Sequence, residues 1–270
     1  MPPAPPVRTL VLVWDGPRPD PAWPEALAGL DWLGGRLPQA AWAALPGLGP
    51  DFTWGPLLGR FWPALGAAGI VAGAINLPGL WPPPAGSGWT LPCPPPDVAR
   101  TDMVHLAHPP ELAPETADLA AGLTWFAARR AVHPHERDTR FAEAAACSRL
   151  VFEHAARLAV ERPVAWLGVG FSGLGEVCAL FAGLDLNRPR LLLSQIDACA
   201  AELAALQRAE AVVLLAGGGG LVWAPGRLPA GPAPLAGPED MIKVLHWLAG
   251  LPQPIGGPPP HPGLARLLAG

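Results

Sequence analysis

Three glycines, Gly168, Gly170 and Gly173, form a GxGxxG pattern between a predicted strand and a predicted helix. Glycines at this spacing let backbone amides approach a pyrophosphate, so the pattern is typical of a dinucleotide-binding site. Such a site also needs an acidic residue about 20 positions further on. The acid here, Asp197, comes later than that and lies in SQIDACAAEL, which indicates the start of a helix. A dinucleotide-binding module stays open as one alternative.

The same stretch, GFSGLG, places Ser172 on the turn after the strand and resembles the nucleophile elbow of α/β-hydrolases. Asp197 and His246 follow in the order of that family's catalytic triad. The elbow needs a second small residue where Leu174 stands, so the pattern is broken. A serine hydrolase using Ser172 and a plain helix cap at Ser172 are both open.

Two histidine pairs, His105 with His108 and His133 with His135, have spacings that can chelate a metal ion. They lie in Pro-rich stretches with no predicted strand or helix to fix them, which favours solvated loop histidines. His154 and His246 fall in predicted helices, where a packed or surface role is expected.

A glycine run, Gly217 to Gly220, follows the apolar segment AVVLLA. In α/β enzymes the loop at the carboxyl end of such a strand carries the chemistry. Successive backbone amides in a glycine-rich turn can also form an anion-binding nest. The run therefore marks either a binding loop or a place where catalytic side chains are missing.

Apolar runs that alternate with amphipathic segments set the positions of these residues. They predict one α/β domain over residues 1–270, with a mostly parallel central sheet and helices on both faces. A Pro-rich, irregular segment is expected at about 80–137. The strands are expected at 7–16, 70–78, 163–171 and 210–216. Helices are expected at 23–37, 57–69, 138–162, 173–184, 195–209 and 238–250.

Composition excludes some classes of function. Half of the 270 residues are hydrophobic, 15% are charged, and the formal net charge is −4. Without a basic patch, neither nucleic acid nor a membrane surface is an expected partner. The four cysteines have no CxxC spacing, and three lie in apolar helical stretches as small buried groups. With no signal peptide and no membrane-length apolar run, a cytoplasmic protein is expected.

Five ordered blocks resemble the alkaline phosphatase superfamily, in particular its type I phosphodiesterase and nucleotide pyrophosphatase-like branch. The first strand ends in Asp-Gly and continues toward Arg-Pro-Asp, and the second runs through Asn-x-Pro to a Pro-Pro loop. The ordered set, rather than any single motif, carries the resemblance, and the shortness of the chain indicates a reduced cap. The blocks are LVLVWDGPRPD, GAAGIVAGAINLPGLWPPPAGSGW, VAWLGVGFSGLGEVCALF, IDACAAELAALQRAEAVVLLAGGGG and EDMIKVLHWLAGLPQP.

In that family two metal ions, usually zinc, flank a Thr or Ser nucleophile. The resemblance gives Asp15 as the metal ligand after the first strand and Thr53 as the nucleophile, with Asp51 as an alternative for that position. An Asp and a His four residues apart correspond to Gly175 and Ala179, and the later Asp-His pair corresponds to Gly217 and Gly218. The last metal-binding His has no counterpart in LVWAPGRLPAGPAPLAGP.

Most of the ligand set is therefore absent, and one carboxylate with one hydroxyl cannot hold two dications. We expect a degenerate member that has lost two-metal phosphoester hydrolysis and binds a small phosphorylated ligand or a protein partner. No cofactor is expected; zinc or another divalent metal is expected only if the chain is active. The enzyme alternative is a metal-dependent hydrolase in which His105, His108, His133 or His135 folds over Asp15.

Overall fold

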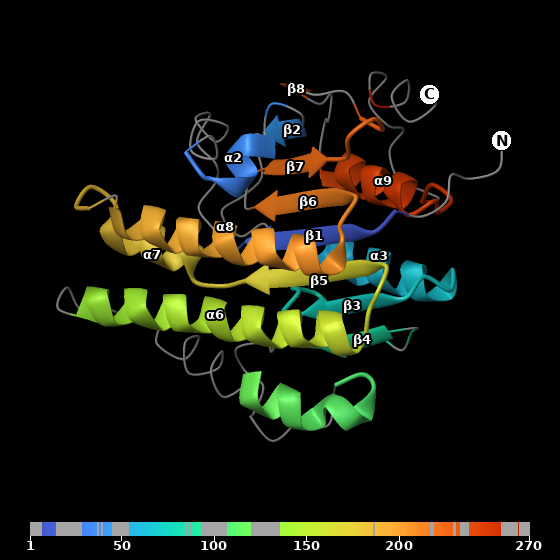
Figure 1. Ribbon diagram of the computed structural model, residues 1–270, viewed down its shortest axis with the longest axis horizontal. Coiled ribbons are helices and arrows are strands. Elements are labelled where there is room, and N and C mark those ends of the chain that lie inside the picture. The colour runs from blue at the N-terminus through green and yellow to red at the C-terminus, as the bar shows by residue number, and fades with distance from the viewer. Residues whose placement is uncertain are drawn as a thin grey trace.

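A computed structural model gives the three-dimensional arrangement of this chain (Figure 1). It describes residues 7–14, 29–36, 38, 40–44, 54–84, 86, 88–92, 107–119, 136–185, 187–216, 219–228, 231–232, 238–254 and 264.

An eight-stranded sheet with the strand order β4-β3-β5-β1-β6-β7-β2-β8 forms the centre of the molecule. The five strands from β4 to β6 are mutually parallel, and β7 runs antiparallel to both β6 and β2. The predicted α/β class with a mostly parallel sheet is therefore confirmed. The strands are β1 (Thr9–Trp14), β2 (Ala41–Ala44), β3 (Ala72–Ile75), β4 (Gly88–Leu91), β5 (Trp166–Phe171), β6 (Ala211–Ala216), β7 (Gly219–Trp223) and β8 (Gly231–Pro232).

Helices cover both faces of this sheet, because successive side chains of each strand point to opposite sides. On β1, Leu10 and Leu12 face a core built with α6, α7 and α8, whereas Val11 and Val13 face a second core built with α3 and α9. Figure 1 shows α6 and α8 lying side by side over the first face. The helices are α2 (Trp32–Arg36), α3 (Gly55–Ala67), α6 (Arg137–Glu161), α7 (Leu174–Phe181), α8 (Asn187–Gln207) and α9 (Pro238–Leu248). A 3-10 turn, η2 (Pro110–Leu112), leads into a further helical segment at 113–119.

The structure differs from the sequence-based expectation at several elements. Strand β4 lies inside the segment expected to be irregular, and it pairs with β3 in register. Helix α8 begins at Asn187, well before the expected 195, and includes Pro189 in its first turn, where proline is tolerated. Strands β2, β7 and β8 are not predicted by the pattern at all.

Within the described residues, no helix combines the length and the apolar character that crossing a membrane requires.

Candidate functional site

The carboxyl ends of three neighbouring strands, β5, β1 and β6, lie side by side at one edge of the sheet. Strand β1 lies between β5 and β6, and Trp14 at its end pairs with Phe171 at the end of β5. On the other side, Val13 pairs with Leu215, so β6 ends level with β1. The metal ligand expected from the resemblance, Asp15, follows Trp14 directly but lies outside the described residues.

Trp54 fastens the start of α3 to the same edge. Its indole Nε1 donates a hydrogen bond of 2.9 Å to the carbonyl oxygen of Ala216, the last residue of β6. The Trp54 side chain is buried, so this contact is shielded from water. The chain neighbours of Trp54 and Ala216 are Thr53 and Gly217; both lie outside the described residues, as do Gly218 and Asp51. The structure thus brings the flanks of the expected nucleophile and of the glycine run together.

Asn76 directly follows β3 and lies at the same edge of the sheet. Its Nδ2 donates to the carbonyl oxygen of Gly170, at 2.8 Å, and to Oγ of Ser172, at 3.0 Å. Its own backbone N–H donates to Leu91 O at 3.0 Å, which ties in β4. The residue is 2% exposed and has a positive φ of 52°, a conformation that asparagine tolerates better than most residues. One side chain therefore joins the ends of β3 and β5.

The two described positions expected to carry a metal-binding Asp and His lie on α7. Gly175 is half-buried and Ala179 is exposed, and neither has a side chain that can ligate a metal ion. The next residue after Gly175, Glu176, instead makes a bidentate ion pair with Arg140 on α6, at 2.7 and 2.9 Å. The described residues at this position do not fit a two-metal centre.

Arg140 is almost completely buried and also contacts Glu143 at 2.8 Å. Burial alone lowers the pKa of Arg140, but the hydrogen bonds to Glu143 and Glu176 outweigh it and raise the pKa above its ordinary value. The charge is therefore retained, and it fixes the first turn of α7 beside the strand ends.

The glycine run has a structural role in its described half. Gly219 and Gly220 belong to β7, and Gly219 pairs with Ala216 across the antiparallel β6–β7 contact. A Cβ on Gly220 would lie 2.3 Å from Cε of Met241 in α9. Gly220 therefore lies against α9, at the flexible end of the Met241 side chain.

The GxGxxG pattern does not form a phosphate loop. Gly168 and Gly170 lie inside β5, where an added Cβ would overlap Leu77 and the Trp62 ring at one position and Asn76 O at the other. Gly173 has a positive φ of 95° and precedes α7. These glycines serve close strand packing and a helix start, so the dinucleotide-binding alternative has no support from the geometry.

The serine, aspartate and histidine of the hydrolase alternative do not meet. Both carboxylate oxygens of Asp197 accept backbone N–H groups at the start of α2, from Trp32 at 2.8 Å and Leu33 at 2.9 Å. His246 lies on the opposite face of the sheet, where its ring packs 5.4 Å from that of Phe61 and its Nδ1 lies 2.7 Å from Pro252 O. A nucleophile elbow holds its serine on a sharp, strained turn. Ser172 shows no such strain, because its φ is not positive.

Of the histidines proposed as replacement ligands, His108 is described. It pairs with Thr90 of β4, and its Nε2 lies 2.9 Å from Gly86 O. Strand β4 is three strands away from β1, which corresponds to about 14 Å at the usual strand spacing. His108 is therefore not placed over the end of β1, and His105, His133 and His135 lie outside the described residues.

Three further titratable side chains, His154, Cys147 and Cys199, lie in helices. His154 is buried, and its ring nitrogens lie 2.9 Å from Glu115 and 3.0 Å from Asp118. Cys147 and Cys199 lie in helices as expected, and burial raises the pKa of each thiol to about 11. Among the residues that the structure describes, no group of three His, Cys, Asp or Glu side chains could hold a metal ion.

Sequence reasoning missed Trp54 and gave Asn76 no role of its own. The Asn-x-Pro block contains Asn76, and a polar residue directly after a buried strand is the signal that points to it. Trp54 gives no such signal, because its partner is a backbone carbonyl far along the chain.

Comparisons with models of protein families, with curated proteins and with solved structures found no match to this chain.

Proposed function

We propose that the chain is a degenerate phosphodiesterase-like protein of the alkaline phosphatase superfamily. In this proposal a site at the carboxyl ends of β5, β1 and β6 binds a small phosphorylated ligand and no longer performs two-metal hydrolysis. The observation that carries the proposal is the adjacency of these three strands, with Trp54 bonded to Ala216 at the same edge. In the sequence, two of the positions that the resemblance expects, Asp15 and Gly217, directly follow β1 and β6.

The loss of hydrolysis is supported by the side chains at α7. A two-metal site needs several carboxylates and imidazoles to compensate for the desolvation of two dications. Gly175 and Ala179 supply none, and the carboxylate beside them, on Glu176, is engaged with Arg140.

The test combines turnover with binding. Purified protein, with zinc or manganese added, is assayed with p-nitrophenyl phosphate and its bis ester, and the same compounds are titrated in a thermal-shift experiment. The proposal expects a ligand-dependent rise in Tm without turnover above buffer. Turnover with bound metal would instead establish a hydrolase that uses replacement ligands. The absence of any rise in Tm would refute the binding of a phosphorylated ligand.

A variant with added metal ligands tests whether Gly175 and Ala179 occupy the places of the family's metal-binding Asp and His. Gly175→Asp combined with Ala179→His restores the expected pair, and elemental analysis should find more bound zinc than in the parent. Gly175→Asp and Ala179→His made singly are the controls, because each supplies only one ligand of the pair. Equal zinc binding by the double variant and by either single variant would contradict the assignment.

A further inference from the structure

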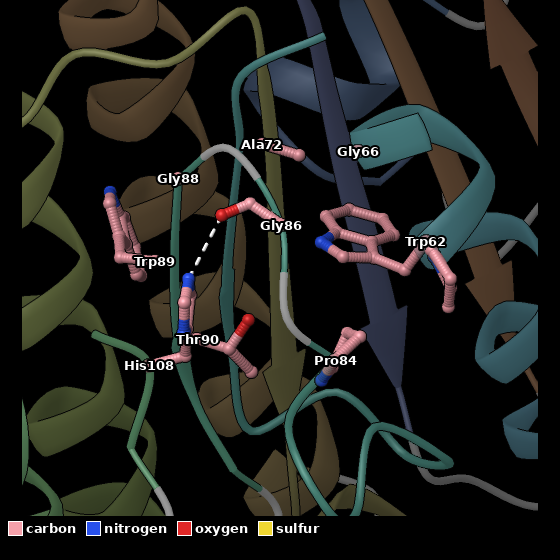
Figure 2. A pocket seen from close by; sticks show the side chains of 10 residues that line it. Trp62, Gly66, Ala72, Pro84, Gly86, Gly88, Trp89, Thr90 and His108 are labelled. Carbon is pink, nitrogen blue, oxygen red and sulfur yellow. Dashed lines mark hydrogen bonds between the residues drawn. The ribbon is translucent and has the colours of Figure 1, made fainter. Parts of the chain in front are cut away.

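A small, partly open space lies at the end of the sheet opposite the proposed site. It has a volume of about 20 Å³ and is lined by α3, by the amino ends of β3 and β4, and by Pro84, Gly86 and His108 (Figure 2). Trp62 of α3, Thr90 of β4 and His108 contribute its polar side chains. A water molecule requires about 10–15 Å³ by this kind of measure, so the space suits one water and excludes an organic ligand.

Trp62 presents an N–H group that the protein leaves without an acceptor. Its side chain is 3% exposed, and among the residues that the structure describes Nε1 has no hydrogen-bond partner. Figure 2 shows the nitrogen edge of this indole turned into the space, toward Gly86 and Thr90. A buried donor with no acceptor is unfavourable, and buried polar groups in folded proteins are nearly always paired with protein or with ordered water.

Thr90 and Gly86 supply the other groups that a bound water needs. Thr90 is 3% exposed and its hydroxyl faces the same space. The carbonyl oxygen of Gly86 lies 2.9 Å from His108 Nε2 and retains a second lone pair. Buried waters make two to four hydrogen bonds, and three groups are present here.

We propose that this space is a binding site for one ordered water molecule, which accepts a hydrogen bond from Trp62 Nε1 and bridges it to the hydroxyl of Thr90. The water joins α3 to strand β4 at a place where the two have no direct polar contact between these side chains. The site is independent of the proposed function, since it lies at the amino ends of the strands.

Trp166 provides a matched control within the same molecule. It is completely buried, and its Nε1 also has no partner within the described part of the chain, but it does not line this space. A water-selective rotating-frame NOE experiment on protein labelled at its tryptophans reads both indole protons, assigned with Trp62→Phe and Trp166→Phe. The sign of the cross-peak separates a bound water from chemical exchange.

The proposal expects a water cross-peak at the indole proton of Trp62 and none at Trp166. No cross-peak at Trp62, or equal cross-peaks at both, would overturn it. Thr90→Val removes the hydroxyl with little change of shape and should weaken the Trp62 cross-peak at least tenfold. Thr116→Val is the control, because Thr116 is equally buried but donates to Leu112 O. An unchanged cross-peak in folded Thr90→Val would refute the bridge.

Discussion

At the scale of single residues, Asn76 combines an unusual backbone conformation with two side-chain hydrogen bonds. Asn76→Ala leaves Gly170 O without its donor, which costs about 1–3 kcal/mol, and places a side chain with a Cβ at positive φ, which costs about 1–2 kcal/mol. Asn76→Gly also loses the hydrogen bond to Gly170 O, but glycine adopts a positive φ without this cost. We therefore expect both variants to be destabilised in urea unfolding, with Asn76→Gly about 1 kcal/mol more stable than Asn76→Ala.

Ser172→Ala controls for the second hydrogen bond of Asn76, because it removes that acceptor and leaves the backbone unchanged. Its loss should be smaller than that of either Asn76 variant. If Asn76→Ala and Asn76→Gly unfolded at the same urea concentration, the left-handed conformation would not contribute to the choice of asparagine.

His246 predicts how stability changes with pH. Burial lowers its pKa from the ordinary 6.5, and the bond to Pro252 O opposes this only in part. The unfolded chain therefore takes up a proton in a pH range where the folded chain does not, so stability is full above about 6.5 and declines as the pH falls below it. Other groups add to the slope, so the variant must be compared with the parent.

His246→Gln keeps a donor for Pro252 O but removes the titrating ring. We expect its free energy of unfolding to fall less between pH 7.5 and pH 5 than that of the parent protein, as measured by urea titrations at each pH. Parallel curves for the two proteins would show that His246 does not contribute to the acid sensitivity.

At the scale of elements, Arg140 joins two helices through a buried ion pair. Its side chain on α6 contacts Glu143 on the same helix and Glu176 on α7, and it is 1% exposed. Removing one partner of a buried pair typically costs about 3–5 kcal/mol, because the other charge stays buried. We expect Arg140→Met to lose stability in that range and to loosen the first turn of α7.

Arg149→Met is the control on the same helix. Arg149 pairs with Glu153 at 3.1 Å, but both side chains are largely exposed, so the loss should be about 0.5 kcal/mol or less. Thermal and urea unfolding measure both variants, and hydrogen exchange follows α7. Similar losses for Arg140→Met and Arg149→Met would mean that burial does not strengthen the Arg140 network.

The elements that were predictable share a physical cause, since β1, β5 and β6 are buried on both faces and form continuous apolar runs. Strand β4 could not be predicted, because its four residues lie between prolines and glycines and gain their structure from pairing with β3. The first turns of α8 likewise contain a proline and lack the apolar period. Local patterns identify an element only where its own residues bury a face.

At the scale of the whole molecule, the alternation of strands and helices predicts a mostly parallel sheet. It predicts neither the order β5-β1-β6 nor the contacts that hold these strand ends together. The Trp54–Ala216 bond joins residues far apart in the chain, and such a pairing has no sequence period. The glycines of β5 were misleading for the same reason, since what they pack against is distant in sequence.

The two cores share every central strand, which predicts that they unfold together. Leu12 packs in the core with α6 and α8, whereas its neighbour Val13 packs in the core with α3 and α9. Leu12→Ala removes apolar contacts from the first core only and should cost about 2–5 kcal/mol. We expect that β1 cannot remain ordered when the core on one of its faces opens. In Leu12→Ala the free energy of opening of α9 should then fall by the same amount as that of α6.

Hydrogen exchange measured by mass spectrometry, under conditions where exchange reports global opening, gives both values in one experiment. Val13→Ala is the reciprocal variant and should lower the protection of α6 through its effect on the other core. Equal losses in α6 and α9 for each variant mean that residues from β1 to α9 form one cooperative domain. A loss confined to the helices on the mutated side would instead make each face of the sheet an independent folding unit.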